Sequence, residues 1–332
     1  MCSSDLQVVW HAETPLLRTA PAPLYLLAQA VRARGDKVIL TGEGADEVFG
    51  GYNIFKEAKL RRLWSQRRSS PRAALVSRLY PYLPNLRKQP SAFLQAFFHA
   101  APDDLAHPCF SHLPRWGLTS RLTLLFSDAV RSSLDGRNAV DEVVAELPAA
   151  YSTWDPLAQA QYLEMRYFLP GYLLSSQGDR VAMAHGVETR FPYLDPGVVR
   201  FGTSLPEPLL LRGLRDKVLL RRVAKPLMSA ALANRDKQPY RAPGTSIFFD
   251  GKAADYVEDL MAPSQIRRDG IFNPDAVDRL VRKCRDGRVV SVKDDMALIG
   301  VLSTQLLIHQ FISHFTTGTH GHQYRGIAAV HH

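Results

Sequence analysis

The 332-residue chain has few cysteines and no recognisable export signal. Its three cysteines, Cys2, Cys109 and Cys284, are widely spaced, and no CxxC pair occurs. An odd count at this spacing argues against a disulfide framework and against a structural zinc site, so we expect a reduced, cytoplasmic setting. The first residues form neither a basic nor an apolar segment, which excludes a typical signal peptide. No apolar stretch is expected to span a membrane, so we expect no membrane contact.

Lysine and arginine outnumber aspartate and glutamate, so the net charge is +9. Hydrophobic residues make up 46% of the chain, which is enough to form the core of one large domain or of two smaller ones. Much of the excess lies in residues 56–78, in a basic stretch that includes Trp64. Such a helix could bind nucleic acid. An apolar stripe of Ile54, Ala58 and Leu63 instead indicates a solvated basic face on a packed helix, so we expect no nucleic-acid partner. An anionic substrate such as a nucleoside triphosphate would account for local positive charge equally well.

The most informative stretch, residues 41–52, reads T-G-E-G-A-D-E-V-F-G-G-Y and follows the apolar run 37–40, which is typical of a buried strand. Ligands of open α/β sheets bind at the carboxyl ends of the strands. Glycines let backbone N–H groups approach phosphates, and carboxylates hold Mg²⁺ or move protons. The alternative is an ordinary strand-to-helix turn with acidic residues at the helix start. The spacing alone favours neither.

The expected fold is α/β, with a parallel sheet followed by a mostly helical region. Residues 8–10 are a strand candidate, 24–34 a helix and 37–40 the next strand, a unit whose connection favours parallel pairing. Parallel sheets usually have at least four strands, so the front of the sheet is expected to be missing. Further helices are expected at residues 91–101, 121–134, 139–146, 156–169 and 218–224, near 257 and 276, and at 295–312.

Three further stretches stand out for their charged residues. Residues 175–195 place Asp179, Arg180 and other charged residues in a core-like pattern, where charges must be paired or used. An internal salt-bridge network is the alternative. Residues 213–222 form a basic helix start. Lys237 lies on a proline-braced loop, which suits a lysine that neutralises phosphate, although a surface lysine is the commoner explanation of such a residue.

Together these stretches resemble the synthetase domain of glutamine-dependent asparagine synthetases. Residues 41–52 are similar to that family's S-G-E-G-A/S-D-E-L-F-G-G-Y block. Residues 177–195 are similar to its D-R-x-S/A-M-A-H block and the segment that follows. Residues 235–243 are similar to its R-x-K-x-P/G-F/Y-x-x-P block. The resemblance runs from about residue 7 to about residue 315 and is nearest to bacterial asparagine synthetase-like amidotransferases, whose acceptor need not be free aspartate.

The resemblance implies a Rossmann-like sheet of the adenine nucleotide alpha hydrolase, PP-loop type, and an ATP-dependent amide-forming ligase. ATP would adenylate a carboxylate such as that of aspartate, and ammonia from glutamine would attack the acyl-AMP to give the amide, AMP and pyrophosphate. Thr41, Gly42 and Gly44 would contact the nucleotide. Asp46 would hold Mg²⁺ on the pyrophosphate.

The remaining roles also come from the resemblance. Glu43 would act as general base or orienting group when ammonia attacks. Lys237 would stabilise charge on the α-phosphate. Asp179 and Arg180 would bind the amino-acid substrate.

The chain also departs from the family pattern, since no S-G-G-x-D-S pyrophosphate loop occurs in it. The family's amino-terminal glutaminase domain, which begins M-C-G-I, is absent as well, and we assign Cys2 no glutaminase chemistry. We therefore expect a foreign start at 1–6, a synthetase domain lacking its first strands at 7–315 and a flexible tail at 316–332. We expect such a chain to be inactive alone. A homodimer is compatible with the resemblance.

Two other functions stay open at this stage. One is a β-lactam synthetase-like ring closure, with Tyr172 and Glu188 as candidates for its tyrosine–glutamate pair. The other is a non-catalytic domain that binds a nucleotide or a partner. Loss of the pyrophosphate loop supports the binding domain, and joint retention of Glu43, Asp46 and Lys237 argues against it.

Overall fold

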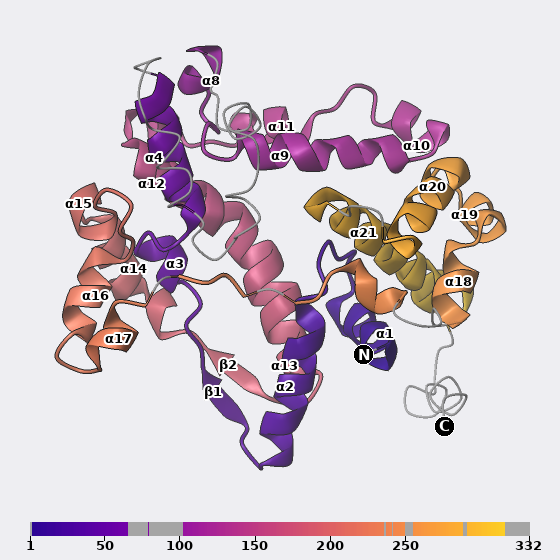
Figure 1. The fold of residues 1–332 in the computed structure, drawn as a ribbon, viewed down its shortest axis with the longest axis horizontal. Coiled ribbons are helices and arrows are strands. Elements are labelled where there is room, and N and C mark those ends of the chain that lie inside the picture. The colour runs from indigo at the N-terminus through magenta and orange to yellow at the C-terminus, as the bar shows by residue number, and fades with distance from the viewer. Residues whose placement is uncertain are drawn as a thin grey trace.

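The computed structural model describes residues 2–65, 79, 102–235, 237–240, 242–249, 255–287 and 291–315. The expected helix 91–101, the expected tail 316–332 and the basic residues Arg67, Arg68, Arg72 and Arg78 lie outside these ranges. The described part is mixed α/β and mostly helical (Figure 1).

The elements follow one another in a simple order, in which η marks 3₁₀-helices except for the π-helices η3 and η6. They are α1 Cys2–Ala12, α2 Pro21–Ala33, β1 Val38–Leu40, α3 Ala45–Val48, α4 Asn53–Ser65, α8 Pro102–Ala106, α9 Leu113–Thr119, η1 Ser120–Leu125, α10 Asp128–Ser133, α11 Ala139–Ala145, η2 Ala149–Thr153, α12 Pro156–Leu163, η3 Glu164–Asp179, α13 Arg180–Met183, β2 Glu188–Arg190, η4 Pro192–Leu194, α14 Pro196–Thr203, α15 Glu207–Leu210, α16 Val218–Ala224, α17 Ala230–Ala233, η5 Thr245–Phe248, α18 Asp255–Met261, α19 Pro263–Asp269, α20 Pro274–Arg285, α21 Val292–Ile308 and η6 His309–Ser313.

The described sheet has two strands, β1 and β2, which pair in parallel with Ile39 opposite Thr189. The strand expected at 37–40 is confirmed as Val38–Leu40 and the sheet is parallel, but the strand that pairs with β1 is β2 and not the expected segment 8–10. The strand expected at 8–10 is wrong, because these residues lie in α1. Val8, Val9 and Ala12 are all buried, a spacing that places them on one face of a helix. The short apolar run 8–10 alone does not distinguish a helix from a strand.

The expectation that β1 is buried is also wrong. Val38 is 43% exposed and Leu40 is 74% exposed. Figure 1 shows the two strands at the lower edge of the molecule, with α2 and α13 beside them. A strand composed for burial therefore has one side uncovered by the described residues.

Most helix predictions are confirmed, and two need correction. The segment 121–134 is split at Ser127, whose hydroxyl accepts the Val130 N–H and caps α10. The segment 156–169 continues through η3 as far as Asp179. Its turns have the wider π spacing, and they accommodate Pro170, which has no N–H to donate.

The larger core is built around α21. Leu298, Val301 and Leu306 are almost fully buried there, and the same cluster includes residues of α1, α18 and α20. By length and composition alone, Val292–Ser313 could cross a membrane, and 50% of its most apolar window is buried inside the structure. Val292–Ser313 therefore departs from the expectation that no apolar stretch is long enough to span a membrane, and it packs as a core helix.

A second core holds the segment that follows the glycine turn. Val48, Phe49 and Phe55 pack with Leu157 of α12 and Leu210 of α15. The basic helix α4 lies largely inside: Ile54 and Ala58 are buried as expected, but so are Lys56 and Arg61, whereas Leu63 is 47% exposed. The expected solvated basic face is therefore wrong for part of this helix.

Asp216 explains how a lysine is buried on α4. Its carboxylate pairs with Lys56 of α4 and, at 2.5 Å, with Nη2 of Arg221 of α16. Burial alone would raise the pKa of Asp216, but the hydrogen bonds and charges of these two partners outweigh it and lower the pKa. The three side chains join two helices that are far apart in the sequence.

We predict that Asp216→Asn lowers the free energy of unfolding by about 3 to 5 kcal/mol, because it leaves two buried cations without their counter-charge. Urea unfolding followed by circular dichroism measures the loss. The matched control is Asp128→Asn, which removes an exposed pair with Arg131 and should cost at most about 1 kcal/mol. Equal losses in both variants would show that the Asp216 cluster does not stabilise the fold.

Candidate active site

The candidate site begins at the turn between β1 and α3. The Thr41 N–H donates to the Arg190 carbonyl at 2.9 Å, which extends the sheet register by one residue. Gly44 then has φ +90°, and a Cβ there would lie 2.3 Å from Cδ2 of Leu194. Only glycine fits both the conformation and the space, and it directs the chain into α3.

Gln161 of α12 fixes the end of α3. Its Nε2 donates to the carbonyl oxygens of Glu47 and Val48 at 2.7 and 2.9 Å. These carbonyls lie in the last turn of a four-residue helix, where no further helical turn can bond them. The turn is therefore attached to a long helix behind it and is not a free loop.

Asp46 is the centre of the site, because two lysines converge on it. Lys217 Nζ lies 2.9 Å from its Oδ1, and Lys237 Nζ lies 2.6 Å from its Oδ2. The three side chains are mostly shielded from solvent, with exposures of 15 to 25%. A Cβ on Gly51 would lie 1.9 Å from Asp46 Oδ1 and 2.3 Å from Lys217 Cε, so this approach requires glycine at position 51.

Sequence analysis singled out Asp46 and Lys237 but gave no site role to Lys217. This lysine precedes α16 in the left-handed conformation, with φ +47°. Its neighbours Asp216 and Val218 are buried, which fixes the backbone on both sides. In the sequence, Lys217 follows Asp216, the one acidic residue of the basic stretch 213–222. This pattern suggests that the charges are paired, but it does not show that Lys217 pairs with the distant Asp46.

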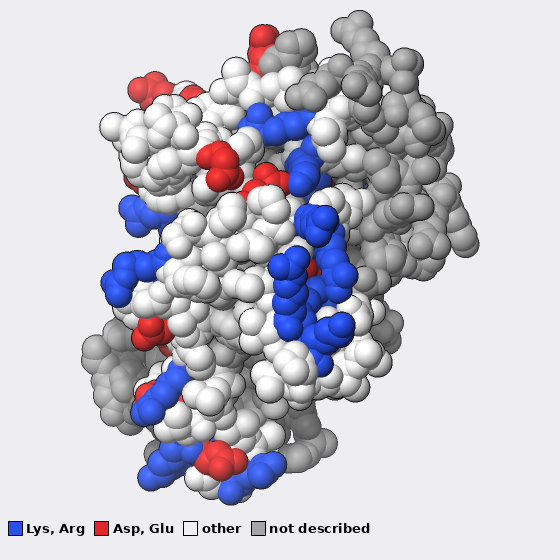
Figure 2. Space-filling model, turned by 90° about the vertical axis from the view of Figure 1, so that its left-hand side faces the viewer, with Lys and Arg blue, Asp and Glu red and all other residues white. Residues whose placement is uncertain are grey.

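The surroundings of the two lysines are basic. Figure 2 shows Lys and Arg side chains gathered on the face that carries α14 to α17. The exposed basic residues from α14 to Arg235 are Arg200, Arg212, Arg215, Arg222, Lys225 and Arg235. A surface of this kind attracts anions before any specific contact forms.

Glu43 faces the same cluster. Burial raises the pKa of its carboxyl and the Asp46 charge raises it further, while Lys237 and Lys217 oppose the shift. A carboxylate of raised pKa is a better proton acceptor than an ordinary surface glutamate. Glu43 is thus close enough to Asp46 and Lys237 to feel their charges.

A buried pair that sequence analysis missed lies behind the cluster. Glu47 is 1% exposed, and its Oε1 accepts a 2.6 Å hydrogen bond from the hydroxyl of Tyr52. Burial raises the pKa of Glu47 to about 7. Lys237 Nζ lies 5.6 Å from the centre of the Tyr52 ring. The five-residue separation of an acid and a tyrosine in the sequence does not predict this contact.

Asp179 and Arg180 do not join the cluster through any contact among the described residues. Asp179 accepts a hydrogen bond from Thr189 of β2. Arg180 donates to Glu13 at 2.7 Å and to Ser175 at 3.2 Å. In this block the structure therefore shows the internal pairing that was weighed as the alternative.

Tyr172 and Glu188 do not form a pair either. The hydroxyl of Tyr172 is buried without a hydrogen bond in the described structure, and burial raises its pKa to about 12. Glu188 is exposed and bonds Arg190 at 2.7 Å. No contact between the described residues thus supports the tyrosine–glutamate pair of a ring-closing enzyme.

The site suits phosphate better than a bare metal ion. Over the described ranges, no three His, Cys, Asp or Glu side chains are grouped to hold a metal. Asp46 supplies one carboxylate, so a Mg²⁺ ion would need phosphate oxygens of a nucleotide to complete its shell, a common arrangement for this ion. The hydroxyl of Thr41 is buried and has no hydrogen-bond partner among the described residues. It is therefore available to donate a hydrogen bond to an oxygen atom of a bound ligand.

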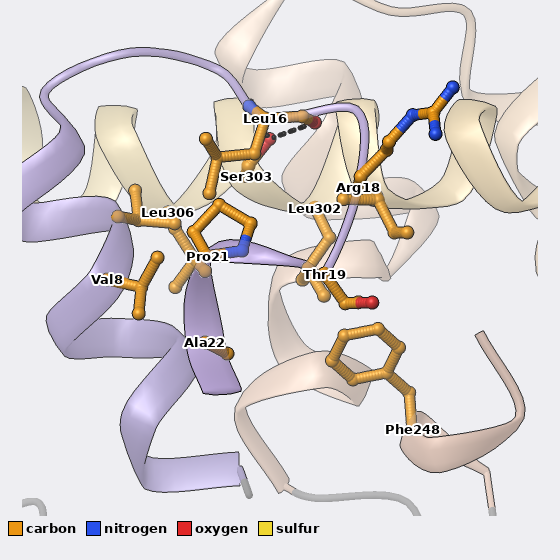
Figure 3. Close-up of a pocket in the computed structure, with 12 residues that line it drawn as sticks. Val8, Leu16, Arg18, Thr19, Pro21, Ala22, Phe248, Leu302, Ser303 and Leu306 are labelled. Atoms are coloured by element: carbon orange, nitrogen blue, oxygen red, sulfur yellow. Dashed lines mark hydrogen bonds between the residues drawn. The ribbon is translucent and has the colours of Figure 1, made fainter. Parts of the chain in front are cut away.

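A small cavity elsewhere does not belong to this site. Figure 3 shows its largely apolar lining, with Val8 of α1, Phe248 of η5, and Leu302 and Leu306 of α21. The hydroxyl of Ser303 at its edge is satisfied by the backbone of Leu16. None of the residues of the Asp46 cluster lines the cavity.

The sequence matches a known protein family over most of its length. Residues 5–309 match the asparagine synthase family. The chain belongs to this family. The resemblance seen in the sequence is thereby confirmed, and the match takes in the glycine turn and both lysine-bearing segments.

The asparagine synthase family includes curated relatives of this chain. A putative asparagine synthetase (glutamine-hydrolyzing) of Mycobacterium tuberculosis H37Rv is 29% identical over 245 residues, which cover 71% of this chain and 34% of that protein. Asparagine synthetase (glutamine-hydrolyzing) 1 of Bacillus subtilis is 26% identical over 247 residues, covering 71% and 35%. The amidase chry2 of Gibberella zeae is 28% identical over 259 residues, covering 70% and 36%. The chain spans about a third of the length of these relatives.

We predict that Glu47→Gln changes how stability depends on pH. Folding raises the pKa of Glu47 from 4.5 to about 7. The folded chain therefore holds a proton that the unfolded chain releases between these values, so its stabilising effect is present below about pH 4.5 and is lost as the pH rises to about 7. Glutamine does not ionise. The unfolding free energy of the variant relative to the parent chain should rise by about 2 to 3 kcal/mol between pH 5 and pH 8.

Urea titrations of both proteins at several pH values measure this difference, and subtraction cancels groups that titrate alike in both. A difference that stays constant from pH 5 to pH 8 would show that Glu47 has an ordinary pKa.

Proposed function

We propose that the chain is the ATP-using, amide-forming part of a ligase of the asparagine synthase (glutamine-hydrolysing) type. Such an enzyme adenylates a carboxylate, with aspartate as the acceptor proposed here, and ammonia derived from glutamine attacks the acyl-AMP. The observation that carries the proposal is the convergence of Lys217 and Lys237 on Asp46 beside a glycine turn. Membership of the asparagine synthase family supports the same reaction class.

The two lysines account for binding of the phosphates. Their ammonium groups are held close together by one shared carboxylate, so the repulsion between them is already offset in the ligand-free chain. An incoming triphosphate can take the place of that carboxylate as counter-charge without reorganising the site. Lys237 would then stabilise charge on the α-phosphate, and Lys217 would assist it.

The turn offers further donors. The N–H groups of Gly42, Glu43 and Gly44 take part in no hydrogen bond with any described residue. The Thr41 N–H is already bonded to Arg190, so its contact with the nucleotide would come from its buried hydroxyl. Asp46 would hold Mg²⁺, which when bound offsets negative charge on the leaving pyrophosphate.

Glu43 is the proposed general base. Ammonium must lose a proton before it can attack, and a carboxylate beside the phosphate site can accept it. Burial and the charge of Asp46 raise the pKa of Glu43. The raised pKa lies closer to that of the ammonium ion from which Glu43 must accept a proton. Binding of the amino-acid acceptor by Asp179 and Arg180 would require both to exchange their present internal partners.

We infer that the two parallel strands belong to a larger Rossmann-like sheet that includes a pyrophosphate loop. The exposed apolar residues of β1 support this inference. Because the 332 residues contain no S-G-G-x-D-S string, we propose that they are inactive unless another segment supplies the loop. ATP–pyrophosphate exchange by the purified 332-residue chain would contradict this part of the proposal.

The residue roles are tested in the full polypeptide in which these residues occur. We predict that Lys237→Met lowers acceptor-dependent ATP–pyrophosphate exchange about 10²- to 10³-fold, since it removes charge stabilisation at the phosphate. Glu43→Gln should leave exchange within a fewfold of the parent while amide formation falls about 10²-fold or more. Radiolabelled pyrophosphate exchange and asparagine formation measure the two steps separately.

Lys59→Met is the control, because Lys59 lies on α4 and pairs with Glu207 outside the cluster. Unchanged exchange in Lys237→Met would overturn the assignment of the site. ATP binding without exchange in the full polypeptide would favour the non-catalytic binding domain.

A further inference from the structure

We propose that Tyr52, held by the buried carboxyl of Glu47, is a positioning residue that fixes the ammonium group of Lys237 beside Asp46. Lys237 lies on a segment, residues 237–240, that has no helix or strand. A lysine side chain is a flexible four-carbon stem, so something must restrict it if it is to act on one phosphate. The described contacts of its ammonium group are Asp46 and the face of Tyr52.

Tyr52 can serve as a fixed surface because it is held at several points. Its hydroxyl donates to Glu47 at 2.6 Å. Its ring meets Phe168 of η3 edge-on, with centroids 6.3 Å apart and an interplanar angle of 72°. Glu47 in turn lies on α3, whose last carbonyls accept hydrogen bonds from Gln161. A chain of contacts therefore runs from the helix formed by α12 and η3 to the Lys237 ammonium group.

The chemistry of the pair also favours a cation above the ring. A phenol that donates a hydrogen bond to a carboxyl gains electron density in its ring, and the negative ring face attracts an ammonium group. Burying a carboxyl is costly, and the Oε2 atom of Glu47 has no hydrogen-bond partner in the described structure. A cost of this kind is more readily explained by a contact that serves the site than by packing alone.

Lys217 provides an internal reference. It pairs with the same carboxylate as Lys237, at 2.9 Å, but lies over no ring in the described contacts. Any change at Asp46, or any general loosening of the fold, acts on both lysines. A change that acts through Tyr52 should act on Lys237 alone.

The test is trace labelling of the 332-residue chain with acetic anhydride, followed by mass spectrometry of the peptides that contain Lys217 and Lys237. Loss of the ring removes one of the two described contacts of the Lys237 ammonium group, so the side chain is less restrained and more accessible to the reagent. We predict that Tyr52→Leu raises the ratio of Lys237 to Lys217 labelling about threefold or more. Tyr52→Phe, which keeps the ring but not the hydroxyl, should raise it less.

Tyr151→Leu is the matched control. Tyr151 is also a buried tyrosine, and its hydroxyl donates to the carbonyls of Pro108 and Gln159. The labelling ratio should not change in this variant. An unchanged ratio in a folded Tyr52→Leu, or in Tyr52→Phe if the leucine variant does not fold, would overturn the proposal.

The purpose given to Lys237 rests on the proposed function, but the labelling experiment does not. It needs no ATP and no catalysis. A raised ratio in a polypeptide without ligase activity would support the positioning role and contradict only the proposed reaction. If activity depends on Lys237 as predicted but the labelling ratio does not change, the proposed reaction is supported and the positioning role of Tyr52 is contradicted.

Discussion

The ion pairs of Asp46 with Lys217 and Lys237 are the interaction on which the rest of the site depends. They join three segments that are far apart in the chain, and each segment has its own structural requirement. The turn needs glycine at positions 44 and 51, and α16 must start from a left-handed residue. Two cations cannot lie this close in a poorly hydrated place without an anion between them. The carboxylate of Asp46 meets that condition.

Two sets of contacts fix the turn between β1 and α3 and the segment that carries Lys217. The continuous helix of α12 and η3 carries Gln161 near one end and Asp179 at the other, so it contacts both α3 and β2. The buried Asp216 pairs connect α4 with α16, which carries the chain directly on from Lys217. The large core around α21 contains none of the residues of the Asp46 cluster and joins residues 8–22 to residues 248–306.

The sequence predicted the local elements well where one signal dominated. Residues 38–40 of the run 37–40 form a strand, and 218–224 is a helix with the expected bounds. It failed where the deciding factor was a distant partner. Val8 and Val9 pack in the same core as residues of α21, nearly 300 residues further along the chain. A prediction made from neighbouring residues cannot take such a contact into account. The buried Lys56 was expected at the surface because its partner Asp216 lies far along the chain.

The same distinction applies to the site. Glycines with neighbouring carboxylates indicated the turn, and the family resemblance added Lys237, but neither gave Lys217 or Tyr52 a role. Their participation depends on how α3, α4 and α16 pack together. Asp179 and Arg180 stood out as charged residues in an apolar block and received a substrate role from the family resemblance, and the structure gives both internal partners. Composition predicts that such charges are satisfied, but it does not predict by what.

The exposed strand β1 has a consequence for handling the protein. Its outer edge offers backbone donors and acceptors next to Leu40, a side chain 74% exposed, and such an edge is a template on which another strand can add. In a concentrated solution the readiest additional strand is the same edge of a neighbouring molecule. Light scattering of this chain should therefore rise with concentration, and a short peptide that occupies the edge should suppress the rise.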